Sequence, residues 1–126
     1  MLYGTEKIVM GNSYLADETD ITRQEGDTGS IVFTISSDLL DLTVYSTVKF
    51  QVRREEDVER TMALVIDKST GSGITISSQT VTVSLDASDT SEKSGSGYRW
   101  EIQFSGNSEI ITAGKGKFII EPELIL

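Results

Sequence analysis

The residues of this chain that come closest to a catalytic motif are Asp27 to Ser30, which read Asp-Thr-Gly-Ser. An Asp in such a sequence can do chemistry when a second carboxylate lies about 3 Å away, because the two groups then share a proton and can activate water. The 126-residue chain contains this motif once. The second carboxylate would therefore have to come from another subunit.

The sequence around this motif disfavours a dimeric aspartic protease. Arg23 to Gly26 predict a solvated approach to Asp27, whereas a catalytic dyad lies in a buried loop after an apolar strand. Such enzymes also place an apolar pair directly before a late Gly, but two residues separate Ile110-Ile111 from Gly114 here. We interpret Gly26-Asp27 as a turn that leads into a strand, and the protease stays a remote alternative.

The remaining carboxylates and glycines do not form a recognisable ligand site. Acidic runs occur at residues 17–20, 55–59 and 86–89, and none has the alternate-residue spacing and central Gly of a calcium loop. Gly114-Lys115-Gly116 lacks the strand-to-helix setting of a phosphate loop and is interpreted as a hairpin turn. The sequence predicts no metal, no cofactor and no catalytic residue.

The amino-acid composition excludes several classes of site and of partner. The chain has no Cys and no His, which excludes disulfides, thiolate zinc sites, cysteine nucleophiles and Ser-His triads. The 11 Lys and Arg against 20 Asp and Glu give a net charge of -9, so we expect neither nucleic acid nor an anionic membrane as a partner. No apolar run approaches the roughly 20 residues of a membrane-spanning helix. The first residues do not read as a secretory signal, and we expect the chain to act in the cytoplasm or in an assembly built there.

Apolar and polar residues alternate along most of the chain, which predicts strands with one buried face. The clearest stretch is GYRWEIQF at residues 97–104. Its predicted inward side chains are Tyr98, Trp100, Ile102 and Phe104, and its predicted outward side chains are Arg99, Glu101 and Gln103. A strand with one dry face turns its rings inward, so we assign the rings to the core rather than to a stacking platform for ligands.

Eight or nine such strands separated by Gly-rich turns indicate an all-β sandwich or barrel. The first strand, around Lys7 to Met10, has the weakest pattern. Residues 54–60 predict a charged hairpin loop, and Asp86 is a candidate cap for a single helical turn. The domain is expected to span residues 21–126, and residues 1–20 predict either an edge strand or an arm that packs on a neighbouring subunit.

Three stretches, in this order, resemble the immunoglobulin-like β-sandwich domains of tailed-bacteriophage baseplate and tail proteins, and are similar to the N-terminal domain of baseplate upper proteins. They are ITRQEGDTGSIVFTISSDLLDLTVYSTVKFQVR, VTVSLDASDTSEKSGSGYRWEIQF and EIITAGKGKFIIEPEL. Together they span residues 21–124. The chain departs from the family where Val44 to Ser46 replace the usual Gly after the Asp-Leu-Thr turn.

This resemblance implies an immunoglobulin-like antiparallel β-sandwich of about eight strands. It implies a structural part of a virion, assembled in the host cytoplasm, that binds other virion proteins and forms a homo-oligomer. The family has no catalytic residues to carry over. The candidate residues of an intersubunit arm are Leu2, Tyr3, Ile8, Val9, Met10, Tyr14 and Leu15. A carbohydrate-binding or host-adhesion module on the same fold is the alternative, since loops of a sandwich readily host such sites.

Replacing Trp100 by Ala tests the assignment of the rings to the core. The substitution should lower the free energy of unfolding by about 3 to 5 kcal/mol, because it leaves a large cavity. Chemical denaturation followed by circular dichroism measures this change. Unchanged stability together with the loss of a bound ligand would instead assign the ring to a binding surface.

Overall fold

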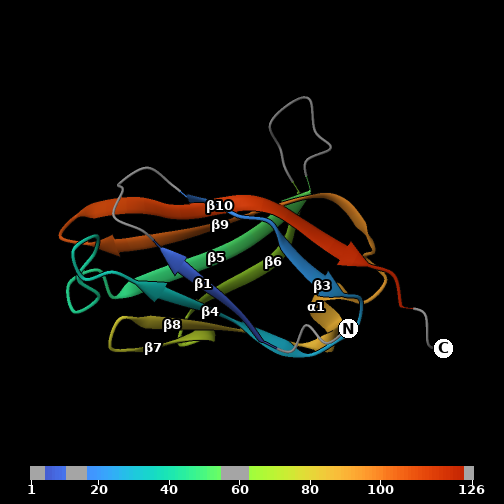
Figure 1. Cartoon of the computed structure of the whole chain (residues 1–126), viewed down its shortest axis with the longest axis horizontal. Coiled ribbons are helices and arrows are strands. Elements are labelled where there is room, and N and C mark those ends of the chain that lie inside the picture. Colours follow the sequence, from blue (N-terminus) through green and yellow to red (C-terminus); the bar gives the residue numbers. More distant parts are fainter. Residues whose placement is uncertain (1–4, 11–16, 55–62, 124–126) are drawn as a thin grey trace.

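The computed structural model describes residues 5–10, 17–54 and 63–123 and shows an all-β protein, which confirms the predicted class (Figure 1). Ten strands and one helical turn form within these residues. They are β1 (Thr5–Met10), β2 (Asp17–Glu18), β3 (Ile21–Gln24), β4 (Gly29–Ile35), β5 (Thr47–Arg54), β6 (Ala63–Thr70), β7 (Gly73–Ser77), β8 (Thr80–Leu85), α1 (Ala87–Thr90), β9 (Gly95–Gly106) and β10 (Glu109–Glu121).

The described strands belong to one mixed sheet that is strongly curled into a half-barrel. Their order is β1-β4-β8-β7-β6-β5-β9-β10-β2, and β3 also pairs with β10. β6 and β7 meet through Ser69–Gly73 and Thr70–Ile74 alone, at the point where the sheet turns over. In Figure 1, β5, β9 and β10 lie above β4, β7 and β8. The sheet is thus continuous, and the two separate sheets of an immunoglobulin-like sandwich are not clearly formed.

Strand direction differs from the expected antiparallel arrangement. β1 runs parallel to β4, both β2 and β3 run parallel to β10, and the short contact of β6 with β7 is also parallel. A two-residue hairpin joins antiparallel strands, whereas the three N-terminal strands pair with segments remote from them in the chain. Alternation of residue types carries no information on direction, so the antiparallel prediction was wrong for these pairs.

The core lies inside the curl and contains the predicted rings. Trp100 has none of its surface exposed, and Tyr98, Ile102 and Phe104 of the same strand are also buried. The Trp100 ring lies 5.6 Å from the ring of Phe33 on β4 and 5.9 Å from that of Phe50 on β5. The assignment of these side chains to the core is confirmed.

The prediction of a hairpin turn at Gly114-Lys115-Gly116 was wrong, because all three residues lie inside β10. The turn between β9 and β10 is formed by Asn107 and Ser108, whose φ angles are 49° and 62°. Two left-handed residues in a two-residue loop match the twist of the flanking strands. The glycines of β10 therefore have a role other than turning the chain.

Gly116 allows the backbone of Thr19 to approach β10. A Cβ atom at Gly116 would lie 2.0 Å from the Thr19 carbonyl oxygen. This oxygen accepts a 2.7 Å hydrogen bond from the indole Nε1–H of Trp100, and the Thr19 amide donates to the Lys115 carbonyl at 3.0 Å. The buried indole donor is thereby paired, and two hydrogen bonds hold Thr19 against β9 and β10.

Substituting Gly116 by Ala tests this close approach. The added methyl group should lower the free energy of unfolding by about 1 to 3 kcal/mol, or more, because two backbone segments must separate and the Trp100 donor loses its acceptor. Gly97→Ala is the matched control, since a Cβ at Gly97 of β9 meets nothing within 4 Å. Equal stability of the two variants in urea denaturation would show that the junction at Thr19 does not hold the fold.

Candidate functional site

Asp27 lies in a turn, as predicted from its sequence. Its amide donates to the Gln24 carbonyl at 3.2 Å, and the preceding Gly26 has a φ of 78°. The Gly26 amide donates to the Thr90 hydroxyl of α1 at 2.9 Å. β4 begins two residues after Asp27. The turn interpretation of Gly26-Asp27 is confirmed.

The residues before this turn are not all solvated, so the prediction of a solvated approach to Asp27 was wrong for Arg23. Arg23 has 1% of its surface exposed, although it was expected in a polar, hydrated stretch. It lies on β3 on the same face as Ile21 and pairs with Ile120 of β10. The alternation in residues 21–24 could have placed Arg23 on the same side as Ile21, but the charge of Arg23 favoured the prediction of a solvated side chain.

The carboxylates of the described residues do not gather into a metal site. No group of three or more acidic side chains in residues 5–10, 17–54 and 63–123 is placed to hold a metal ion. The acidic run at residues 55–59 lies outside these residues, as does most of the predicted charged loop at 54–60. The acidic run at residues 86–89 lies within the described residues, and its carboxylates make structural contacts.

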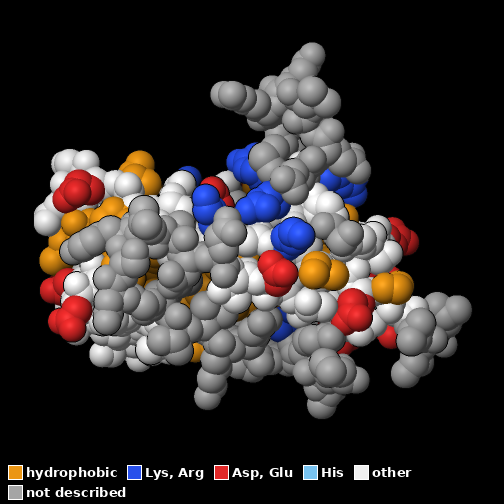
Figure 2. Space-filling view, turned by 45° about the horizontal axis from the view of Figure 1, so that its top comes forward, with side chains coloured by type: hydrophobic (Ala, Val, Ile, Leu, Met, Phe, Trp, Pro, Cys, Tyr) orange, Lys and Arg blue, Asp and Glu red, His pale blue; other side chains and the backbone are white. Residues whose placement is uncertain are grey.

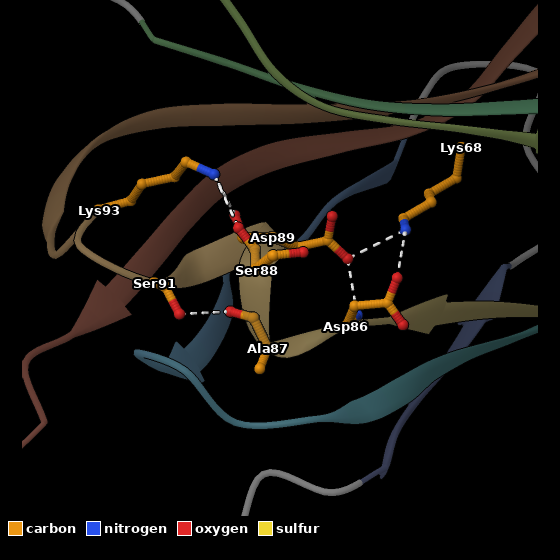
Figure 3. Close-up of polar contacts among 7 residues, drawn as sticks. All are labelled: Lys68, Asp86, Ala87, Ser88, Asp89, Ser91 and Lys93. Atoms are coloured by element: carbon orange, nitrogen blue, oxygen red, sulfur yellow. Dashed lines mark hydrogen bonds and ion pairs between the residues drawn. The ribbon is translucent and has the colours of Figure 1, made fainter.

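Asp86 and Asp89 start the helical turn that was predicted there (Figure 3). The Asp86 amide donates to the Asp89 Oδ2 atom at 2.7 Å. Lys68 of β6 lies 3.0 Å from the same oxygen and 3.9 Å from the Asp86 Oδ2 atom. The Lys68 and Asp89 side chains are only 13% and 16% exposed, against 79% for Asp86. These groups therefore bind β6 to α1 rather than facing a substrate.

The polar sides of β5, β9 and β10 form a surface that we call the outer face. Its cationic members are Lys49, Arg53, Arg99, Lys115 and Lys117, and Glu101 lies among them. The predicted outward positions of Arg99, Glu101 and Gln103 are confirmed by their partial or full exposure. A shallow depression on this face is lined by Lys49, Gln51, Glu101 and Gln103. Figure 2 shows Lys and Arg side chains gathered over these strands.

The β4–β5 loop and the β9–β10 turn form a second surface, which we call the loop end. It carries the exposed carboxylates Asp38, Asp41 and Glu109 and the exposed apolar side chains Val44 and Ile110. Figure 2 shows hydrophobic and acidic side chains together at the left end of the molecule. This surface was not predicted from the sequence.

Hydrogen bonds hold the side chains of the loop end in place. The Tyr45 hydroxyl donates to Glu109 at 3.1 Å. The Thr43 hydroxyl donates to Asp41 at 2.7 Å, and this bond and the Thr43 amide hold the pKa of Asp41 below its usual range. Asp41 therefore stays ionised to a lower pH than an ordinary Asp.

The candidate arm residues are only partly described. Ile8, Val9 and Met10 lie on β1, beside β4 of the same chain. Leu2, Tyr3, Tyr14 and Leu15 lie outside the described residues. The arm stays a prediction, and so does the division of the chain at residue 20. Asp17 and Glu18 pair with Gly114 and Lys115 within the chain.

Comparisons with known proteins show a related fold. No protein-family model matches the chain, and no curated protein matches it. The structure is similar to the N-terminal domain of phage TP901-1 ORF48, with a TM-score of 0.62 and 10% identity over 93% of this chain and 98% of that chain. An uncharacterized protein from Bacillus anthracis str. Ames gives a TM-score of 0.43 and 6% identity over 94% of this chain and 86% of that chain. The first likeness shows a shared fold.

Membrane-spanning helices are also absent from the described part of the chain. None of its helical residues form a segment long and apolar enough to cross a bilayer.

A double-mutant cycle tests whether Lys68 and Asp89 act as a structural pair. Replacing both residues by Ala, singly and together, should give a coupling energy of about 1 kcal/mol or more, because the pair is largely buried. The Lys68–Asp86 cycle is the control and should give less than about 0.5 kcal/mol, since Asp86 is exposed. Equal coupling in the two cycles, measured by urea denaturation, would contradict the structural role of Asp89.

Proposed function

We propose that this chain is a non-catalytic structural protein of a tailed-phage virion, located in the tail, the baseplate or a head-tail accessory. The observation that carries the proposal is the fold likeness to the N-terminal domain of phage TP901-1 ORF48, which covers 93% of this chain and 98% of that one. A likeness over nearly all of both chains concerns the complete domain rather than one shared hairpin.

The sequence resemblance supports the same role through the order and spacing of its strands and turns. The three stretches that resemble baseplate and tail domains correspond to β3 to β5, to β8 through β9, and to β10. In the finer form of the proposal, the fold is an immunoglobulin-like sandwich whose layers are β1-β4-β8-β7 and β6-β5-β9-β10. Other virion proteins and further copies of the chain are its partners, and residues 1–20 contribute an intersubunit arm.

The described polar groups also suit a role in assembly. Because a fold alone does not determine function, the positions of the charged side chains matter for the proposal. Asp27 lies in a turn beside α1, and Asp89 is held by Lys68 and the Asp86 amide. Asp27 thus belongs to a turn and the Asp89 carboxylate to a structural contact, while Lys and Arg side chains of the described strands β5, β9 and β10 are at least partly exposed on the outer face.

The alternative of a carbohydrate-binding or host-adhesion module depends on exposed aromatic side chains in loops. Of the three tyrosines outside the predicted strands, Tyr3 and Tyr14 lie outside the described residues. Tyr45 is half-buried, and its hydroxyl bonds to Glu109. No observation on the described residues favours this function over assembly.

Mass spectrometry and immunogold electron microscopy of purified phage particles test the proposal. Particles produced from the genome that encodes the chain should contain it in several copies, with the label on one region of the virion. An abundant host protein serves as the control for contamination. A chain that is abundant in the lysate but missing from purified particles would contradict the structural role, and specific binding on a glycan array would then favour adhesion.

A further inference from the structure

The outer face contains three cationic residues in one row across neighbouring strands. The register places Lys117 of β10 beside Arg99 of β9, and Arg99 beside Arg53 of β5. Neighbouring strands lie about 4.8 Å apart, so the row spans about 10 Å. The row thus places three positive charges side by side on the outer face.

This concentration of positive charge contrasts with the rest of the molecule. The whole chain has 11 Lys and Arg against 20 Asp and Glu, and five of the cations lie on the outer face. Arg53 is held in place by a 3.0 Å hydrogen bond from its guanidinium to Gln51 of the same strand. A surface that approaches this row gains most if it carries carboxylates.

The loop end carries the opposite, negative charge. Residues 36–46 and 105–110 contain Asp38, Asp41 and Glu109 but no Lys or Arg. Ile110 is 71% exposed and Val44 is also exposed, so the carboxylates surround apolar area that a partner can bury. The hydrogen bonds from Tyr45 and Thr43 orient two of the carboxylates before any partner arrives. Pre-oriented charges lose less entropy on binding.

We propose that the outer face of one copy binds the loop end of a second copy. The inference rests on the homo-oligomer of the proposed function and names the surfaces that form it. Lys117, Arg99 and Arg53 of the first copy meet Asp38, Asp41 and Glu109 of the second, while Val44 and Ile110 lose exposure at the contact.

Because the two surfaces differ, the contact is heterologous. Repetition of such a contact closes a ring or extends a filament, and it does not stop at a two-fold dimer. A net charge of -9 makes copies repel one another at long range. The complementary surfaces thus select one orientation among many, which is the effect that charge usually has at interfaces.

Charge reversal followed by mixing tests this contact. The cation variant carries Arg99→Glu and Lys117→Glu, and the carboxylate variant carries Asp38→Lys and Glu109→Lys. Each variant alone should self-associate at least about tenfold more weakly than wild type in sedimentation velocity and light scattering, because both contact surfaces then have one sign. An equal mixture should associate again, since each surface of one variant is complementary to a surface of the other.

Matched variants separate a local effect from a change in net charge. Arg99→Gln with Lys117→Gln shifts the net charge by the same amount as Thr75→Glu with Ser84→Glu, which alters exposed positions of β7 and β8 outside both surfaces. Only the first pair should weaken association. Circular dichroism melting checks that each variant is folded, and Lys117→Glu alone replaces the cation variant if the double substitution unfolds.

Several results would overturn the inference. They are a wild-type chain that stays monomeric at every concentration, reversals that leave association unchanged, and a mixture that fails to associate although both variants are folded. Association that survives both reversals would assign assembly to residues 1–20 instead. All of these results leave the presence of the chain in virions untouched, so failure here is distinguishable from failure of the proposed function.

Discussion

The buried indole of Trp100 is the group on which the rest of the structure depends. Its ring lies against Phe33 and Phe50 with no exposed surface, so water cannot reach its N–H. A buried donor without an acceptor is costly, and the Thr19 carbonyl supplies the acceptor at 2.7 Å. This bond lies where the chain passes from β2 to β3 along β10, and the same Thr19 carbonyl leaves Gly116 no room for a side chain. The largest ring of the core and the edge of the sheet are therefore coupled through one backbone carbonyl.

The N-terminal strands β1, β2 and β3 also determine which strand edges of the sheet are paired within the chain. β1 covers β4 at one end of the strand order, and β2 and β3 cover β10 at the other. An uncovered edge offers unpaired N–H and C=O groups to any strand of another protein. β1 pairs with β4 from Ser30 to Ile35, and β2 and β3 pair with β10 at Gly114–Lys115 and Phe118–Glu121. At these positions the recognition that we propose depends on side chains, which the outer face and the loop end provide.

Local alternation predicted the all-β class and the inward side of β9, because burial of one face is recorded in every second residue of a strand. It failed wherever a contact between remote residues decided the structure. Gly116 was predicted to lie in a turn, yet it pairs with Trp100 within the β9–β10 ladder, and the Thr19 backbone lies against it. Arg23 reads as solvated, yet β3 directs it to the same side as Ile21. Strand direction was equally hidden, since β1 and β4 have the same alternating pattern whether they run parallel or antiparallel.

The same limit on prediction from sequence applies to the outer face and the loop end. Sequence period placed Arg99, Glu101 and Gln103 on the outward side of β9, and the structure confirms it. Sequence period could not place Lys117 and Arg53 beside Arg99, because that row depends on the register of β9 with β10, which shifts between Thr112 and Gly114, and on the pairing of β9 with the remote strand β5. The loop end likewise needs the β4–β5 loop to meet the β9–β10 turn, where Gly106 lets the Val44 carbonyl approach. Charged surfaces in β proteins thus arise from register and loop packing, which the alternation of residue types along one strand does not record.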